Sequence, residues 1–143
     1  MRVLIVEDEP LIAMSLSEQI SQAGHTVLGP ASSSAEALEL AEEAPTMALV
    51  DIDLECKLAG VSVVRELKYR FRVPAFFVTG QRECAAQNAD AALGVISKPF
   101  ELSDIPQALE VAAQILRGGT PPPPSIPSSL QLFGGAARPP AWN

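Results

Sequence analysis

Five short apolar runs, separated by segments with helical spacing, constrain the possible folds more than any other feature of this sequence. The runs cover residues 2–6, 25–28, 46–52, 73–79 and 93–97. Continuous apolar runs of this length, bounded by turn residues, are typical of strands that are covered on both faces in a parallel sheet. Because a helical pattern follows each run, the alternation predicts an α/β fold with a doubly wound, five-stranded parallel sheet, five helices and right-handed crossovers.

Boundary signals mark the first two helices clearly. Pro10 suits the first turn of a helix, which Gly24 then stops. Ser33 and Glu36 have the spacing of a capping box, which predicts that the second helix begins there. Three further helices are expected, at residues 61–71, 81–92 and 103–117.

A change of composition after Gly118 divides the chain into two parts. Residues 1–118 have the length of one ordinary domain. Residues 119–143 are rich in proline, glycine and serine and too poor in apolar side chains to bury a core. We therefore expect one domain at 1–118 and a disordered tail at 119–143. The alternative is a docking segment, whose apolar side chains would be Leu130, Leu132, Phe133 and Trp142.

The net charge of −7 and the isoelectric point of about 4.6 limit the classes of partner. Binding to nucleic acid needs clustered Lys and Arg, so no nucleic-acid partner is expected. The apolar segment at the start of the chain ends at Glu7 and Asp8, and it is much shorter than the ~20 apolar residues that a membrane span needs. We therefore expect no membrane anchor and no secretory leader. Two cysteines, Cys56 and Cys84, are too few for a disulfide framework, which favours free thiols in the cytoplasm.

Reactive or charged side chains lie at four strand ends, on the edge of the sheet where the carboxyl ends of parallel strands meet. They are Glu7 and Asp8 after the first run, Asp51 and Asp53 at the third, Thr79 at the fourth and Lys98 after the fifth. Each alone has an ordinary explanation, because acidic residues favour helix N-termini and a terminal Thr or Lys is commonly solvated. Together they indicate a functional crevice, which open α/β sheets place beyond these strand ends.

The carboxylates of this predicted crevice indicate a metal ion and a nucleophile. Three carboxylates held together repel one another and tend to protonate unless a cation lies among them. Mg²⁺ takes oxygen ligands and keeps waters and phosphoryl oxygens in its shell, so two or three carboxylates suffice to hold it. Asp51 is then a candidate nucleophile that forms an aspartyl phosphate. Lys98 would bind the same phosphoryl group, and Thr79 could donate a hydrogen bond to it.

The motifs at these strand ends, taken in order, resemble those of response-regulator receiver domains in two-component signalling. They are Val6-Glu7-Asp8-Glu9, Asp51-Ile52-Asp53, Thr79-Gly80 and Lys98-Pro99-Phe100. The resemblance covers about residues 1–118 and implies a flavodoxin-like sheet with the strand order 2-1-3-4-5.

The resemblance also implies a role for each residue at the strand ends. Asp51 would be the phosphoacceptor, Thr79 would contact the phosphoryl oxygen after switching, and Lys98 would pair with it. The implied ligands of Mg²⁺ are Glu7, Asp8, Asp51 and the backbone carbonyl of Asp53. The implied donor is a histidine kinase or a histidine phosphotransfer protein. The resemblance implies no enzyme activity beyond the chain's own phosphorylation and dephosphorylation.

The sequence departs from the family pattern at two places. Glu55 stands where family members often have a proline, four residues after the phosphoacceptor. Val95 stands where most receivers carry the aromatic residue that swings inward on phosphorylation, and FFVTGQ at 76–81 resembles a receiver subset that lacks this aromatic. Either Val95 simply suits a strand, or residues 80–92 move in its place. In the second case, partners would contact the face made by 80–92, the fifth strand and the last helix.

Three functions from different classes remain open at this point. The first is a single-domain receiver that signals through a downstream protein, because no output domain follows Gly118. The second is a phosphorylation-independent interaction module with a vestigial acidic pocket, which the complete set of site residues disfavours. The third is a hydrolase of the aspartyl-phosphate kind, for which no cap domain is visible. A homodimer through the last two strands and helices is a further implication of the resemblance.

Overall fold

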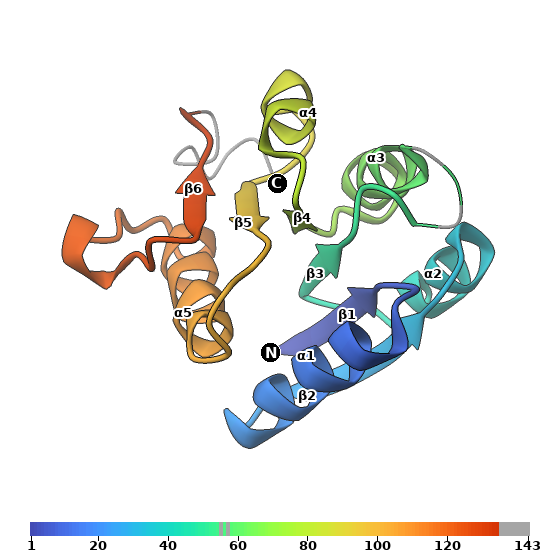
Figure 1. The fold of residues 1–143 in the computed structure, drawn as a ribbon, viewed down its shortest axis with the longest axis horizontal. Helices are drawn as coiled ribbons and strands as arrows, with labels where there is room; N and C mark the ends of the chain where they lie inside the picture. The colour runs from blue at the N-terminus through green and yellow to red at the C-terminus, as the bar shows by residue number, and fades with distance from the viewer. Residues whose placement is uncertain (55, 57, 135–143) are drawn as a thin grey trace.

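The computed structural model describes residues 1–134 except 55 and 57 (Figure 1). The described residues form the strands β1 (Arg2–Val6), β2 (Thr26–Ala31), β3 (Met47–Val50), β4 (Ala75–Thr79), β5 (Gly94–Ser97) and β6 (Leu130–Leu132). The α-helices are α1 (Pro10–Gln22), α2 (Ser34–Ala41), α3 (Ala59–Glu66), α4 (Arg82–Gln87) and α5 (Asp104–Leu116). A π-helical turn, η1 (Leu67–Phe71), continues α3, and a short 3-10 helix, η2 (Pro123–Ser125), precedes β6.

The sheet has the order β2-β1-β3-β4-β5-β6. The first five strands are parallel and confirm the predicted order 2-1-3-4-5, whereas β6 is an additional, antiparallel edge strand. Val6 pairs with Val50, so the residues that follow, Glu7 and Asp51, leave the sheet side by side. Thr79 pairs with Ser97, so Lys98 follows directly beside Thr79. The register thus brings the predicted site residues to one edge of the sheet.

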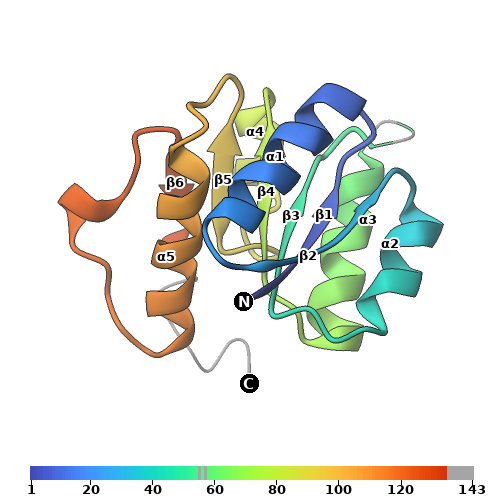
Figure 2. The same ribbon diagram turned by 90° about the horizontal axis from the view of Figure 1, so that it is seen from below.

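Helices cover both faces of the sheet, as Figure 2 shows. α1 and α5 pack on one face, where Leu16 and Leu109 belong to one apolar cluster. α2, α3 and α4 pack on the other face, where Val64 and Ala85 belong to a second cluster. Successive side chains of β1 alternate between the two clusters, as the period of two along a strand requires. Both faces are therefore buried, which explains the continuous apolar runs.

Two helix boundaries, the start of α2 and the end of α4, follow from local hydrogen bonds, and the bounds of α3 differ from the prediction. The Ser33 hydroxyl accepts a hydrogen bond from the Glu36 N–H at 3.2 Å, which confirms the predicted start of α2. The helix predicted at 61–71 begins at Ala59 and is α-helical only to Glu66. The helix predicted at 81–92 is shorter than expected, because the side chain of Asn88 donates to the Cys84 carbonyl oxygen at 2.9 Å and caps the end of α4.

The tail differs from the expectation of disorder over residues 119–134. Residues 130–132 pair with β5, and Leu130 and Phe133 are buried. The reason is that the edge of β5 supplies backbone hydrogen bonds and two apolar clusters that the tail could not supply alone. The division at residue 118 stays a prediction, and Trp142 lies outside the described residues. Within the described residues no helix has the length and apolar character needed to span a bilayer.

Candidate functional site

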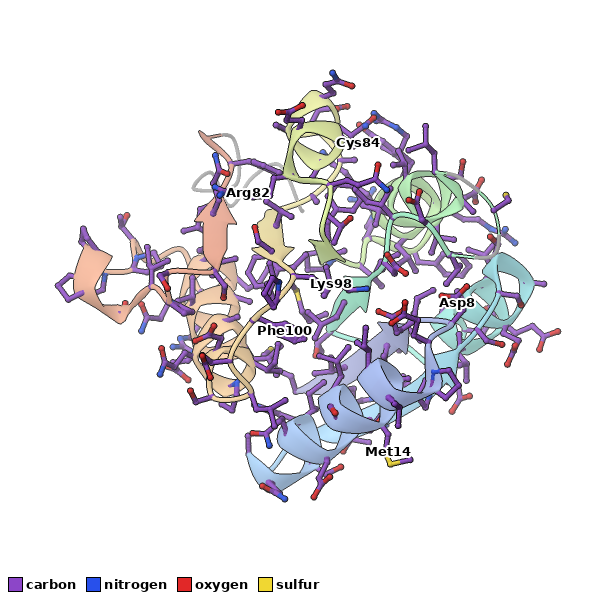
Figure 3. The ribbon with its side chains drawn as sticks, in the orientation of Figure 1. Asp8, Met14, Arg82, Cys84, Lys98 and Phe100 are labelled. Atoms are coloured by element: carbon purple, nitrogen blue, oxygen red, sulfur yellow. The ribbon has the colours of Figure 1, made fainter. Side chains whose placement is uncertain are left out.

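The predicted site residues converge in one crevice at the carboxyl ends of the strands. A cavity of about 560 Å³ is lined by side chains from the loops after β1, β3, β4 and β5. The lining includes Asp8, Asp51, Asp53, Thr79 and Lys98. Figure 3 shows the Lys98 side chain extending from the end of β5 toward the side of the crevice where Asp8 lies.

Two of the carboxylates are held inside the protein. Glu7 is 2% exposed and Asp51 is 7% exposed, because each directly follows a strand that is covered on both faces. Asp8 is the more exposed member of the group. One oxygen from each of the three carboxylates lies within 4.8 Å of the others. The structure therefore brings together the acidic group that the sequence predicted.

Lys98 provides positive charge between the two buried carboxylates. Its Nζ lies 3.1 Å from Glu7 Oε1 and 3.8 Å from Asp51 Oδ2. The backbone N–H of Lys98 donates to the Thr79 carbonyl oxygen at 2.9 Å, which fixes the start of the loop after β5. One lysine cannot neutralise three carboxylates, so the crevice keeps an excess of negative charge.

Burial, together with that excess charge, changes the protonation of Asp51. Burial, and next the charge of Glu7, raise the pKa of Asp51 to about 7, although Lys98 acts in the opposite direction. The Asp53 N–H also favours the ionised form by donating to Asp51 Oδ1 at 3.3 Å. Without added positive charge, Asp51 therefore titrates near neutral pH.

The donor set of the crevice fits a hard divalent cation. Glu7 Oε1 is buried and has an ion-pair partner in Lys98, but it accepts no hydrogen bond from the described residues. A buried carboxylate oxygen with spare coordination, next to two more carboxylates, suits Mg²⁺. Glu7, Asp8 and Asp51 are the residues that would hold the ion. The predicted role of the Asp53 backbone carbonyl stays a prediction.

Thr79 and Gln81 organise the opposite wall of the crevice. Thr79 is buried, and its hydroxyl oxygen accepts a hydrogen bond from the Gln81 N–H at 3.0 Å. The Gln81 side-chain amide donates to Asp53 Oδ2, and the second Asp53 oxygen accepts from the Leu58 N–H at 3.1 Å. Gln81 was not among the site residues predicted from the sequence. The available signal was its place two residues after Thr79, at the end of the FFVTGQ segment.

Gly60 is a second residue that the sequence analysis missed as a part of the site. A Cβ atom at this position would lie 1.8 Å from the Asp51 carbonyl oxygen. The Gly60 N–H donates to the Ile52 carbonyl oxygen at 2.7 Å. The first turn of α3 therefore packs directly on the backbone that carries Asp51, which only glycine permits. Glu55, where the sequence departs from the family pattern, lies outside the described residues.

A family comparison agrees with this arrangement. The model of the response regulator receiver domain matches residues 3–110. The chain belongs to this family. The receiver domains of solved structures have the same flavodoxin-like fold, including the solution structure of the Erythrobacter litoralis PhyR receiver domain. That domain has 32% sequence identity and a TM-score of 0.68, over 76% of this chain and 86% of that chain. The crystal structure of PhyR from Brucella abortus has 32% identity and a TM-score of 0.66, over 78% of this chain and 51% of that one.

Curated relatives are regulators of several lengths. The phyllosphere-induced regulator PhyR of Methylorubrum extorquens is 35% identical over 77% of this chain and 42% of its own length. The transcriptional regulatory protein PdtaR of Mycobacterium tuberculosis is 34% identical over 81% of this chain and 58% of its own length. The chain thus spans about half the length of these two relatives. The chemotaxis protein CheY of Thermotoga maritima is 30% identical over 76% of this chain and 93% of its own length.

Proposed function

We propose that this receiver is a phosphoacceptor, in which Asp51 takes a phosphoryl group from the phosphohistidine of a histidine kinase or a histidine phosphotransfer protein. The observation that carries the proposal is the position of Lys98 Nζ between two buried carboxylates, 3.1 Å from Glu7 and 3.8 Å from Asp51. An ammonium group in this place can pair with phosphoryl oxygens that arrive at Asp51. Membership of the receiver family, whose members are signalling modules, supports the same role.

In the proposed transfer, one carboxylate oxygen of Asp51 forms a bond to phosphorus while the phosphorus–nitrogen bond of the phosphohistidine breaks. The imidazole keeps the electron pair of that bond and then takes a proton from solvent. Lys98 moves its ammonium group from Glu7 toward the phosphoryl oxygens. The Thr79 hydroxyl accepts from Gln81, so its own proton is available for donation to a phosphoryl oxygen. When bound, Mg²⁺ would favour the ionised form of Asp51 and offset the charge of the phosphoryl group.

An apolar surface beside the crevice supports a protein as the donor. Leu11 is 78% exposed and Met14 is 61% exposed on α1, and Leu102 is exposed on the loop after β5. A shallow cavity of about 480 Å³ between these elements is lined by Leu11, Phe100 and Lys98, among others. Because Lys98 lines both this cavity and the crevice, a protein bound here would present its phosphohistidine directly to Asp51. We propose this surface as the docking site of the donor.

The experiment that tests the proposal is incubation with acetyl phosphate and Mg²⁺, followed by intact-mass measurement and mapping of the label. We expect one phosphoryl group per chain, located at Asp51 and absent from Asp51→Asn. Asp53→Asn is the matched control, because it removes a neighbouring carboxylate and should keep the label. Absence of any label would favour the interaction module, and continuous turnover of acetyl phosphate would favour the hydrolase.

We also propose that the reaction takes place in the cytoplasm and that the signal passes to a downstream protein. The sparse cysteines and the free thiols of Cys56 and Cys84 support a reducing compartment. A homodimer through the last two predicted strands and helices, β4, β5, α4 and α5, stays a prediction of the family resemblance. Because β6 occupies the edge of β5, such a dimer requires β6 to leave that edge.

A further inference from the structure

The edge of β5 is closed by residues 120–134, which we call the strap. Figure 1 shows β6 of the strap lying beside β5, near α5. The antiparallel register pairs Gly94 with Leu132, Val95 with Gln131 and Ile96 with Leu130. Two backbone hydrogen bonds extend the pairing, from the Phe133 N–H to the Leu93 oxygen at 3.0 Å and from the Ser97 N–H to the Ser129 oxygen at 2.9 Å. The strap therefore satisfies edge groups that would otherwise be open to a strand of another protein.

The strap is anchored on both faces of the sheet. Leu130 is buried in the cluster formed with α1 and α5. Phe133 is buried in the opposite cluster, which includes Ala85 of α4 and Val95 of β5. Leu130 and Phe133 are three residues apart in an extended segment. Because side chains alternate between the two faces of a strand, an odd separation places these two on opposite faces. Between them, Gln131 is exposed and lies opposite Val95, the position where the family pattern has an aromatic residue.

Gly94 is the residue of β5 that allows the strap to lie so close. A Cβ atom at Gly94 would lie 2.4 Å from the Gln131 carbonyl oxygen and 3.2 Å from the Leu132 Cα. Both contacts are with backbone atoms, so a rotamer change could not relieve them. A single added methyl group at Gly94 therefore excludes the strap from the β5 edge.

Two short connections join the strap to the phosphorylation site. Arg82, the first residue of α4, donates from Nη2 to Gln131 Oε1 at 3.0 Å, and Figure 3 shows its side chain reaching toward β6. The residue before Arg82 is Gln81, whose N–H donates to the Thr79 hydroxyl. The second connection runs through Ser97, which directly precedes Lys98 and whose N–H donates to the strap. Lys98 thus adjoins a residue that holds the strap, and Thr79 is connected to one through its hydrogen bond with Gln81.

We propose that the strap is an autoinhibitory element, which closes the β5 edge in the unmodified protein and leaves it on phosphorylation, so that a strand of a protein partner can add to β5. The inference rests on the proposed phosphorylation of Asp51. Movement of Thr79 and Lys98 toward the phosphoryl group displaces Gln81 and Ser97, and these displacements weaken the strap. The strap is held by a three-residue strand, the buried side chains of Leu130 and Phe133, and side-chain hydrogen bonds of Gln131 and Ser129. Because these contacts are few and lie at the edge of the sheet, the strap can leave without unfolding the five parallel strands.

The strap also defines the chemistry of the partner strand. It binds antiparallel to β5, with apolar side chains at the positions of Leu130 and Phe133 and a hydrogen-bond acceptor facing Arg82. A partner that adds a strand to this edge would present the same pattern. The released edge would accept such a strand because its backbone groups and both apolar clusters become exposed.

Hydrogen exchange of the full chain, with and without beryllium fluoride and Mg²⁺, tests the release of the strap. We expect exchange of residues 129–133, and of the Ser97 amide, to rise by at least about 5-fold with the phosphoryl mimic, the lower bound of usual coupling strengths. Gly94→Ala should give the same rise without the mimic. Because coupling is reciprocal, this variant should also bind beryllium fluoride more tightly, by up to the same factor. Gly134→Ala is the matched control, because its Cβ meets no atom within 4 Å.

The outcomes separate this inference from the proposed function. Labelling of Asp51 by acetyl phosphate, with strap exchange unchanged by the mimic, overturns the inference alone. Absence of labelling overturns both. Arg82→Ala provides a second variant in case Gly94→Ala does not fold, because it removes only the surface contact with Gln131. Arg82→Ala should raise the hydrogen exchange of the strap in the absence of the mimic, and the mimic should then cause a smaller further rise than in the wild type. If the mimic causes the same rise in Arg82→Ala as in the wild type, the connection through α4 is contradicted.

A peptide of residues 127–134 tests strand addition directly. We expect it to bind the full chain carrying Leu130→Ser and Phe133→Ser, in which the strap has lost both anchors. Binding should be lost when Gly94→Ala is added to that protein. Failure of the peptide to bind a folded double variant would overturn the proposal that the edge accepts a partner strand.

Discussion

Replacing Asp51 with asparagine should stabilise the cation-free protein at neutral pH more than in mild acid. Burial and the charge of Glu7 raise the pKa of Asp51 from 3.8 to about 7. The folded protein therefore binds this proton more tightly than the unfolded chain does, so folding stability is lost as the pH rises from 3.8 to about 7. At about 1.36 kcal/mol per pKa unit, the full loss is at most about 4 kcal/mol, because solvent in the open crevice screens part of the interaction. The side-chain amide of the Asp51→Asn variant does not ionise, so the variant avoids that loss.

Urea unfolding in EDTA measures this effect as a difference between the wild type and Asp51→Asn. The advantage of the variant should grow by about 2–3 kcal/mol between about pH 5 and about pH 8, because most of the titration of Asp51 lies in that interval. Glu39→Gln, which removes an exposed carboxylate on α2, is the control for general charge effects. An advantage that stays constant across this pH range, or a variant less stable than the wild type at about pH 8, would refute the reasoning.

Four further predictions follow from the same site. Millimolar Mg²⁺ should raise the Tm of the wild type, and Glu7→Gln with Asp8→Asn should abolish that rise in a thermal shift measurement. Lys98→Ala should cost about 2–3 kcal/mol in urea unfolding at neutral pH by leaving the Glu7 carboxylate unpaired, and adding Glu7→Gln should restore most of the loss. Gly60→Ala should lower the unfolding free energy by more than about 2 kcal/mol, because its methyl group collides with the backbone below it. Met14→Glu should leave labelling by acetyl phosphate unchanged but slow transfer from a phosphorylated histidine kinase, which rapid-quench kinetics would measure.

Four of the parallel strands could be placed from the sequence because each is buried on both faces: β1, β3, β4 and β5. The order of the strands in the sheet came from the family resemblance. Burial on both faces leaves a continuous apolar run, and β1 is bounded in the structure as the sequence predicted. The end of β2 was harder, because Gly29 and Pro30 are turn signals in the sequence. In the structure β2 continues to Ala31, since it lies at the edge of the sheet and Pro30 needs no partner for a backbone N–H there.

The strap could not be assigned from local sequence, for two physical reasons. Its strand is only three residues long, and the segment before it is rich in proline, at residues 121–124 and 127, which is not typical of a strand. Its order comes from the edge of β5 and from the two apolar clusters, which exist only after the rest of the domain has folded. The sequence did indicate Leu130 and Phe133 as apolar side chains available for docking, and these are the residues that are buried.

The site was predictable where the chemistry lies at strand ends and unpredictable where it depends on tertiary contacts. Glu7, Asp51 and Lys98 each directly follow a strand, so the register alone places them together. Gln81 enters the site through a hydrogen bond to Asp53, which is 28 residues away in the chain. No local pattern encodes that contact.

The charge balance of the crevice supports the proposed route of the signal through β5. Glu7 and Asp51 are buried at a cost in stability, and Lys98 offsets part of that cost by ion pairs with both. A phosphoryl group on Asp51 adds about −1.5 to −2 charges at this point, so the electrostatic advantage of moving the ammonium group outweighs the loss of its pairing with Glu7. The residue before Lys98 is Ser97, whose backbone N–H binds the strap. The lysine that offsets the buried charge is therefore next in the chain to a residue that holds the strap, and this is the route that we propose for the signal to the edge of the sheet.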